Sequence, residues 1–140
     1  MPDMTHTFLD HIDQRVRSLR DALPFYDALM EALGMQRITN DDSAEWAGYA
    51  YEDADDGDPI PTPFFGLIPS PGHRTDETRI AFAAPTRADV DRIADAVRRA
   101  GAKAVEGPEI CAEYSPRYYA VFFEDQDGNH FEVCCRQAEA

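Results

Sequence analysis

The spacing of apolar residues predicts a helix near the start of the chain. Apolar side chains recur there at intervals of three and four, which places them on one helical face. They are Leu19, Ala22, Leu23, Tyr26, Leu29, Met30 and Leu33. Asp21 is the predicted N-cap and Gly34 the C-terminal stop, while Pro24 is tolerable only if it lies in the first turn.

A second helix is predicted past the middle of the chain. Its apolar face comprises Val90, Ile93, Ala94, Val97 and Ala100. Thr86 and Asp89 have the spacing of a capping box before it, and Gly101 ends it.

Short runs of β-branched and aromatic residues predict strands around both helices. In the first half these runs are Thr7–Ile12, Met35–Thr39, Ala44–Tyr51 and Phe64–Ile68. In the second half they are Arg79–Ala83, Lys103–Glu106, Tyr118–Phe123 and His130–Cys135. An acidic loop with prolines, Glu52–Pro63, separates two of the strands in the first half.

The order of strand, helix and three strands therefore occurs twice. His11 and Arg79 in the opening strands are 68 residues apart, the two helix-ending glycines 67, and Gly66 and Glu132 in the closing strands 66. This pattern predicts an α+β fold of two βαβββ modules with mixed sheets and a cleft between them. We expect one domain over residues 1–140, with modules at about 5–69 and 77–136 and a linker at about 70–76.

Composition narrows the possible partners and the compartment. Asp and Glu number 27 against 13 Lys and Arg, a formal net charge of −14. Such a surface disfavours nucleic acid and anionic lipid, whose phosphates attract basic patches. No run approaches the length of about 18 apolar residues that a membrane span needs, and no secretory signal is recognisable. Three cysteines without a CxxC indicate reduced thiols in the cytoplasm rather than disulfides or a thiolate zinc site.

Four segments resemble the vicinal-oxygen-chelate superfamily, which includes glyoxalases, bleomycin resistance proteins and extradiol dioxygenases. They are LDHI, PFYDALMEALGM, RIAFAAPTRADVDRIADAVRRAGA and YYAVFFEDQDGNHFEVCCR. The last is the most specific, since an aromatic strand leads through an Asp-rich turn into a strand carrying Glu132. The resemblance implies that the two modules form a curved cup for a small ligand, often over a divalent metal, and that the protein is a homodimer.

The resemblance also implies where a metal would bind. The matching positions in the opening and closing strands are His11, Gly66, Arg79 and Glu132. Only His11 and Glu132 can donate to a metal, because a guanidinium is always protonated and has no lone pair. An Arg79–Glu132 salt bridge filling the metal position is the expected consequence.

The remaining candidates concern the ligand. Apolar walls with a few polar groups are typical of small-molecule sites. The candidate substrate-binding residues are Arg79, Trp46, Tyr49, Phe65 and Tyr118. Cys134 and Cys135 point to opposite faces of a strand, so at most one faces the cup. No base near either thiol is identifiable from spacing, so a nucleophilic role is disfavoured.

Three functions remain open at this point. The favoured one is a metal-free protein that binds a small molecule, with Arg79 gripping an anionic or carbonyl oxygen. The alternative is a lyase/isomerase or dioxygenase with one divalent metal (Zn, Ni, Mn or Fe) on His11 and Glu132. In a weaker third hypothesis, an enzyme without metal uses Glu132 or His11 as general base and Arg79 to stabilise an oxyanion.

Overall fold

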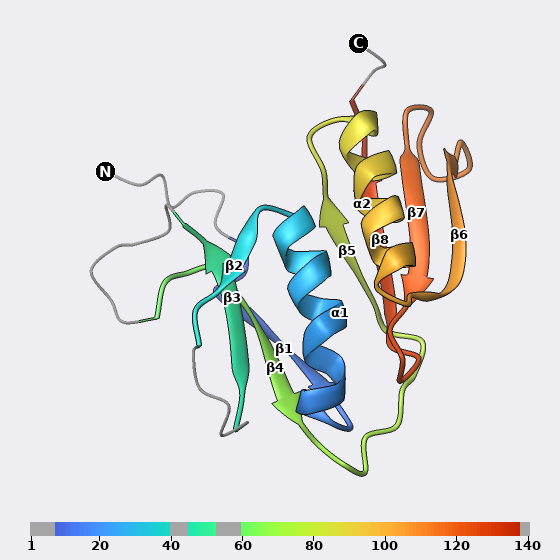
Figure 1. The fold of residues 1–140 in the computed structure, drawn as a ribbon. Helices are drawn as coiled ribbons and strands as arrows, with labels where there is room; N and C mark the ends of the chain where they lie inside the picture. The colour runs from blue at the N-terminus through green and yellow to red at the C-terminus, as the bar shows by residue number, and fades with distance from the viewer. Residues whose placement is uncertain (1–7, 40–44, 53–59, 138–140) are drawn as a thin grey trace. The chain divides into compact units, whose positions relative to one another are not determined.

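A computed structural model describes residues 8–39, 45–52 and 60–137. The elements in chain order are β1 (His11–Val16), α1 (Leu19–Ala32), β2 (Met35–Arg37), β3 (Ala47–Tyr51), β4 (Phe64–Pro69), β5 (Arg79–Ala83), α2 (Arg87–Arg99), β6 (Lys103–Ile110), β7 (Tyr119–Glu124) and β8 (His130–Cys135). Figure 1 shows this order along the chain. No helix in the described residues is both long and apolar enough to span a membrane.

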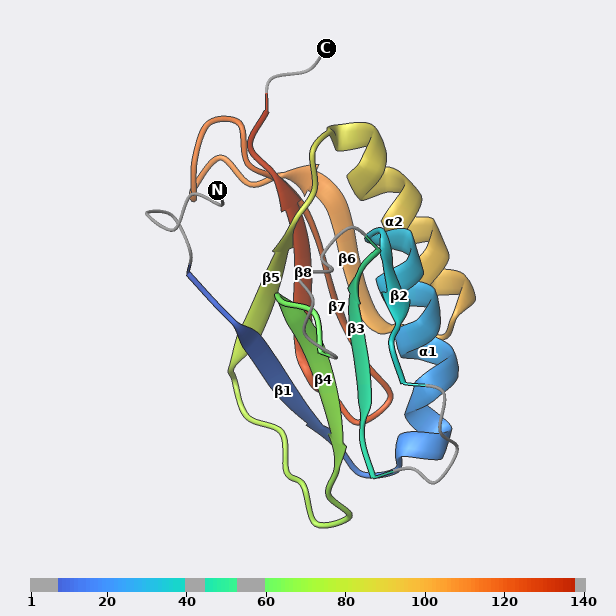
Figure 2. The ribbon, with the colours of Figure 1, turned by 90° about the vertical axis from the view of Figure 1, so that its left-hand side faces the viewer.

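The strands form two four-stranded sheets of the same design. Their orders are β1-β4-β3-β2 and β5-β8-β7-β6. In each sheet the first and last strands in sequence lie side by side and parallel, as β1 and β4 do in Figure 2. The other strand pairs are antiparallel. The predicted α+β fold of two βαβββ repeats with mixed sheets is confirmed.

The strand register supports the repeat residue by residue. His11 lies opposite Phe64 in the first sheet, and Arg79 lies opposite His130 in the second. Gly66 lies two residues after Phe64 on β4, and Glu132 lies two residues after His130 on β8, so they occupy equivalent positions in the two closing strands. The 68-residue and 66-residue offsets of the sequence therefore describe real equivalences between the sheets.

The chain divides into two compact units that do not coincide with its two halves. One unit contains Met1–Asp21 and Gly34–His73, and the other contains Ala22–Leu33 and Arg74–Ala140. Most of α1 therefore belongs with the second sheet, although it precedes the first sheet's other strands in sequence. The chain passes from the first unit to the second for the last time after His73, within the segment predicted as a linker.

Two predictions about α1 are wrong. Ser18, not Asp21, caps the helix, since its Oγ accepts a hydrogen bond from the Asp21 N–H at 3.2 Å. Asp21 lies inside the first turn, where the helix dipole stabilises a negative charge. Pro24 lies beyond the first turn, contrary to the condition set by the sequence. The helix tolerates it because only the Arg20 carbonyl loses its N–H donor, and Arg20 is exposed near the start of the helix. Gly34 ends the helix as predicted, with φ +92°.

Several strand boundaries also differ from prediction. β1 begins at His11 rather than Thr7 and continues to Val16, because its pairing with β4 begins at Phe64. β6 continues to Ile110 rather than ending at Glu106, through two irregularities in its register with β7. β3 begins at Ala47. Residues 7, 40–44 and 53–59, to which parts of the predicted strands and acidic loop belong, lie outside the described residues.

The core of the second unit is an aromatic layer between α1 and the second sheet. The Phe25 ring lies 6.3 Å from Phe123, and the Tyr26 ring lies 5.9 Å from Phe131, both edge to face. α2 adds the buried side chains of Val90, Ile93, Ala94 and Val97. Figure 1 shows α2 lying along β7 and β8. Both helices therefore pack against the same face of this sheet.

A buried hydrogen-bond cluster joins α1 to the turn between β7 and β8. The Tyr26 hydroxyl donates to Asp125 at 2.5 Å. Asp125 also accepts from the backbone N–H groups of Asp127 and Asn129, both at 2.9 Å, and from the Asn129 amide at 2.7 Å. Burial, and then the Asp125 charge, raise the pKa of Tyr26 well above its usual value. A buried carboxylate with several donors satisfies the requirement that interior charges be hydrogen-bonded.

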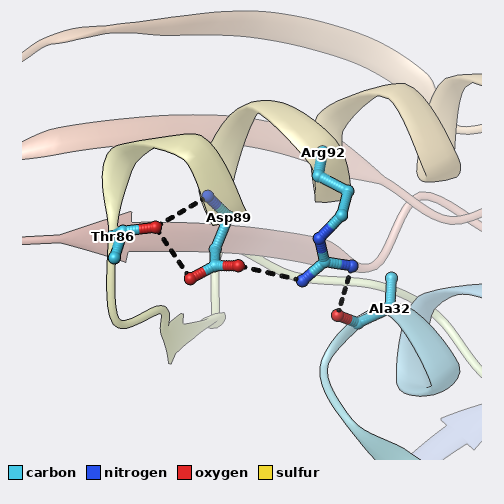
Figure 3. Close-up of polar contacts among 4 residues, drawn as sticks. All are labelled: Ala32, Thr86, Asp89 and Arg92. Atoms are coloured by element: carbon cyan, nitrogen blue, oxygen red, sulfur yellow. Dashed lines mark hydrogen bonds and ion pairs between the residues drawn. The ribbon is translucent and has the colours of Figure 1, made fainter.

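The predicted cap of α2 is confirmed and also connects the two helices. The Thr86 Oγ accepts from the Asp89 N–H at 3.1 Å. Asp89 in turn contacts Arg92 at 3.2 Å, and Arg92 donates to the Ala32 carbonyl at the end of α1 at 3.0 Å (Figure 3). The α2 cap therefore orients an arginine that satisfies one of the α1 C-terminal carbonyls.

We predict that Tyr26→Phe lowers the free energy of unfolding by about 1–3 kcal/mol, because a buried carboxylate loses a donor. Tyr119→Phe is the matched control. It also removes a phenol that donates to an aspartate, Asp91 at 2.6 Å, but at an exposed position, where the loss should be below about 1 kcal/mol. Urea unfolding measures both. Equal losses in the two variants would contradict a special role for the buried contact.

Candidate functional site

Strand alternation gives the second sheet two chemically different faces. Phe131, Val133 and Cys135 point towards the helices and are buried. The opposite face, which we call the Arg79 face, carries Arg79, Tyr118, Phe122, Glu132 and Cys134. Register places Phe122 directly beside Glu132 and Ala120 beside Cys134. This face therefore combines a guanidinium, a carboxylate, a thiol and aromatic rings.

Arg79 lies over an aromatic ring rather than beside an acid. Its guanidinium carbon is 5.0 Å from the centre of the Phe122 ring. Since β8 lies between β5 and β7, the side chain crosses β8 to reach that ring. Within the described part of the chain, no carboxylate lies within 4.0 Å of this guanidinium. The expected Arg79–Glu132 salt bridge is therefore wrong.

Glu132 instead accepts a hydrogen bond from the Tyr118 hydroxyl. Both side chains are buried. Arg136 covers the Tyr118 ring at 4.9 Å, and Tyr114 meets it edge to face at 5.3 Å. Burial raises the pKa of Tyr118, and its hydrogen bonds with Cys134 and Glu132 raise it further. The phenol therefore remains a proton donor to Glu132 throughout the physiological range.

The three thiols differ in their surroundings. Cys134 is partly exposed and shares the Arg79 face, whereas Cys135 is buried on the opposite face, with its sulfur 3.6 Å from the Pro85 carbonyl. The opposite orientations of this pair are as predicted. Burial raises the pKa of Cys111, and the nearby charges of Glu113 and Glu109 raise it further, which suppresses the reactive thiolate there.

The first sheet presents His11 in an aromatic and acidic setting. The imidazole stacks on Phe64 with ring centres 4.5 Å apart and planes 3° from parallel. Its Nδ1 contacts Asp10 at 2.8 Å and its Nε2 lies 3.9 Å from Asp13. The Trp46 ring lies 5.9 Å from Phe64. We call the surface made by His11, Asp13, Trp46 and Phe64 the Asp13 face.

Asp13 is a candidate site residue that the sequence analysis did not identify. A Cβ added to Gly66 would lie 2.6 Å from the Asp13 Oδ1, so this carboxylate occupies the space that a side chain at 66 would fill. Because Gly66 corresponds to Glu132 in the repeat, each sheet presents a carboxylate near that position. The signal lay in the alternation of His11 and Asp13, but the predicted strand ended at Ile12.

Tyr49 and Phe65, two predicted substrate-binding residues, lie elsewhere. They are opposite each other across β3 and β4, on the face away from His11 and Trp46, and both are buried. The other predicted residues form two groups. His11 and Trp46 belong to the first unit, and Arg79, Tyr118 and Glu132 belong to the second.

The donor set does not fit a complete divalent-metal site. Of the four positions that the resemblance implies, Gly66 and Arg79 have no donor atom, and Glu132 is engaged by Tyr118. Among the described residues, no three His, Cys, Asp or Glu side chains gather as potential ligands. A catalytic metal typically takes three protein ligands and leaves a position open for substrate.

Comparison with known families agrees with the architecture. The sequence model of the Glyoxalase/Bleomycin resistance protein/Dioxygenase superfamily matches residues 8–133. The chain belongs to this superfamily. Among curated proteins, none matches the sequence significantly. The match confirms the resemblance to this superfamily that the four sequence segments indicated.

Solved structures of this superfamily share its fold. A glyoxalase/bleomycin resistance protein from Albidiferax ferrireducens is 22% identical with a TM-score of 0.71, covering 92% of this chain and 98% of its own. The fosfomycin resistance protein FosX from Listeria monocytogenes is 14% identical with a TM-score of 0.67, covering 94% of each chain.

A mutant of the Listeria FosX has been solved with Mn(II) and 1S,2S-dihydroxypropylphosphonic acid. It is 16% identical with a TM-score of 0.63, covering 91% of this chain and 88% of its own. At these identities the likeness establishes the fold of the glyoxalase-like chain and not its ligand.

The raised pKa of Tyr118 predicts a loss of stability at alkaline pH. In the unfolded chain the phenol ionises near pH 10, while in the folded protein it stays protonated. Its stabilising contribution is complete below pH 10, and it falls by up to about 1.4 kcal/mol per pH unit above that value. Tyr118→Phe removes this contribution. The decline of unfolding free energy between about pH 10 and 11 should therefore be shallower in the variant, as measured by urea unfolding at each pH.

Parallel declines in Tyr118→Phe and the wild type would contradict this assignment. Tyr26→Phe offers a second comparison, because the pKa of Tyr26 is raised as well. Its decline should also be shallower than that of the wild type.

Proposed function

We propose that this glyoxalase/bleomycin-resistance-like protein binds a small anionic molecule on the Arg79 face without a complete metal site. The observation that carries the proposal is the Arg79 guanidinium, exposed and held over Phe122 at 5.0 Å without an acidic partner in the described residues. An arginine presents five N–H donors in a planar fork that matches a carboxylate or phosphonate. In a protein of net charge −14, a guanidinium without a carboxylate partner is chemically suited to an anionic ligand.

The neighbouring side chains define the kind of anion. Phe122 and Cys134 are partly exposed on this face, and they pack against the buried cluster of Cys111, Tyr118 and Ala120. Glu132 is buried beside this cluster and accepts a hydrogen bond from Tyr118. A small organic anion with an apolar or aromatic body fits this combination better than an inorganic ion does.

Arg79→Ala should weaken binding of 8-anilino-1-naphthalenesulfonate, an aromatic anion, by about tenfold or more, because a charge-assisted hydrogen bond is lost. Arg79→Lys should give an intermediate affinity, since it keeps the charge and loses the fork. Arg20→Ala, with the same change in net charge, is the control. Fluorescence titration of the folded proteins measures all four affinities. Equal dissociation constants for wild type, Arg79→Ala and Arg20→Ala would exclude the proposal.

The second candidate is a divalent-metal-dependent lyase/isomerase or dioxygenase that uses His11 and Glu132. The observation in its favour is the Asp10 carboxylate at 2.8 Å from the His11 Nδ1. A carboxylate behind a histidine commonly orients the other nitrogen towards a metal. The incomplete donor set and the engagement of Glu132 by Tyr118 favour the metal-free proposal.

Metal analysis separates the two candidates. The metal-free proposal predicts less than about 0.1 equivalent of Zn, Ni, Mn or Fe in protein purified without chelator, and no saturable Mn(II) binding by calorimetry, because two donors hold a divalent ion weakly. Stoichiometric metal that is lost in both His11→Ala and Glu132→Gln would establish the metal-dependent alternative instead.

A further inference from the structure

Two glycines leave a strip of the first sheet without side chains. Gly48 on β3 and Gly66 on β4 lie directly opposite each other, so both would direct a side chain to the same face. A Cβ at Gly48 would lie 2.6 Å from the Trp46 Cζ3, and a Cβ at Gly66 would lie 2.6 Å from the Asp13 Oδ1. The indole ring and the carboxylate therefore rest on the backbone of two paired residues.

This packing brings an indole and a carboxylate together, because opposite Cα atoms of neighbouring strands are only about 4.5–5.5 Å apart. Phe64 and His11 continue the surface. Phe64 meets the Trp46 ring at 66° and stacks against His11. The result is a continuous aromatic surface with a carboxylate set into it.

Two carboxylates approach His11 on this surface, and strand alternation also places the exposed Arg15 on the same face of β1. The two carboxylates are those of Asp13 and Asp10, and Asp13 pairs with no Lys or Arg in the described residues. The side chains of His11 and Asp13 are 43% and 40% exposed, so the carboxylate remains accessible. Beside Asp13, a cation would gain both the carboxylate and the electron-rich ring faces.

We propose that the Asp13 face binds an organic cation, a protonated or quaternary amine, with Asp13 as counter-ion and Trp46 and Phe64 as cation–π partners. Trp is the strongest cation–π partner among the side chains, and aromatic surfaces recognise quaternary ammonium groups. The proposed site is on the first sheet, it has the opposite charge preference to the Arg79 face of the second sheet, and its test does not depend on the anion-binding proposal.

The protein contains one tryptophan, so its fluorescence reports directly on the proposed site. The probe is benzyltrimethylammonium, titrated at constant ionic strength with excitation of Trp46. Benzenesulfonate, an aromatic anion of similar size, is the matched probe. The expected result is a saturable change in Trp46 emission with the cation and no saturable change with the anion.

Two variants test the assigned roles. Asp13→Asn should raise the dissociation constant of benzyltrimethylammonium about tenfold, and Phe64→Leu should raise it by about threefold or more. Asp95→Asn changes the net charge by the same amount at an exposed position on α2 and should leave the constant within about twofold. Circular dichroism verifies that each variant is folded.

Three outcomes would overturn the proposal. These are a linear response to the cation, an equal response to benzenesulfonate, or an equal change in Asp13→Asn and Asp95→Asn. Arg79→Ala should leave cation binding unchanged, so failure of one site leaves the other separately testable.

Discussion

The hydrogen bond from Tyr26 to Asp125 is the constraint on which the second unit depends. It joins residues 99 positions apart and is buried at both ends. The turn before β8 and the Tyr26 hydroxyl together supply the hydrogen-bond donors that the buried Asp125 carboxyl needs. The same contact keeps α1 against the second sheet, where Phe25 and Tyr26 meet Phe123 and Phe131. A helix from the first half thereby helps to build the core beneath the Arg79 face.

That core fixes the chemistry of the opposite face through strand alternation. With Phe131 and Val133 held against the helices, Glu132 must point the other way, towards Tyr118. The closing strand of the first sheet has glycine at the equivalent position, and Asp13 from the neighbouring strand fills the space. The repeat is thus preserved in the backbone while the side chains diverge. This divergence allows one fold to present a guanidinium on one sheet and a carboxylate among aromatic rings on the other.

Two of the positions that the superfamily resemblance implies are unsuited to a metal ion. Arg79 cannot donate to a cation, and Glu132 is hydrogen-bonded to Tyr118. If Arg79 had paired with Glu132, each charge would have neutralised the other, and this face would present no unpaired charge to a ligand. The observed arrangement leaves the guanidinium over Phe122, where its donors remain available. This contrast between a guanidinium on the second sheet and a carboxylate on the first is the basis of the two binding proposals.

The sequence by itself determined the order of elements, both helix-ending glycines, the α2 cap and the register equivalence of His11 with Arg79, because these depend on local spacing and backbone geometry. It also identified the family from four segments. Tertiary structure alone decided the start of β1, the partner of Glu132 and the position of Asp13 beside Gly66. Each of these depends on which strand pairs with which and on which side chain packs into a given space. The periodicity of one segment carries no information about the segment that packs beside it.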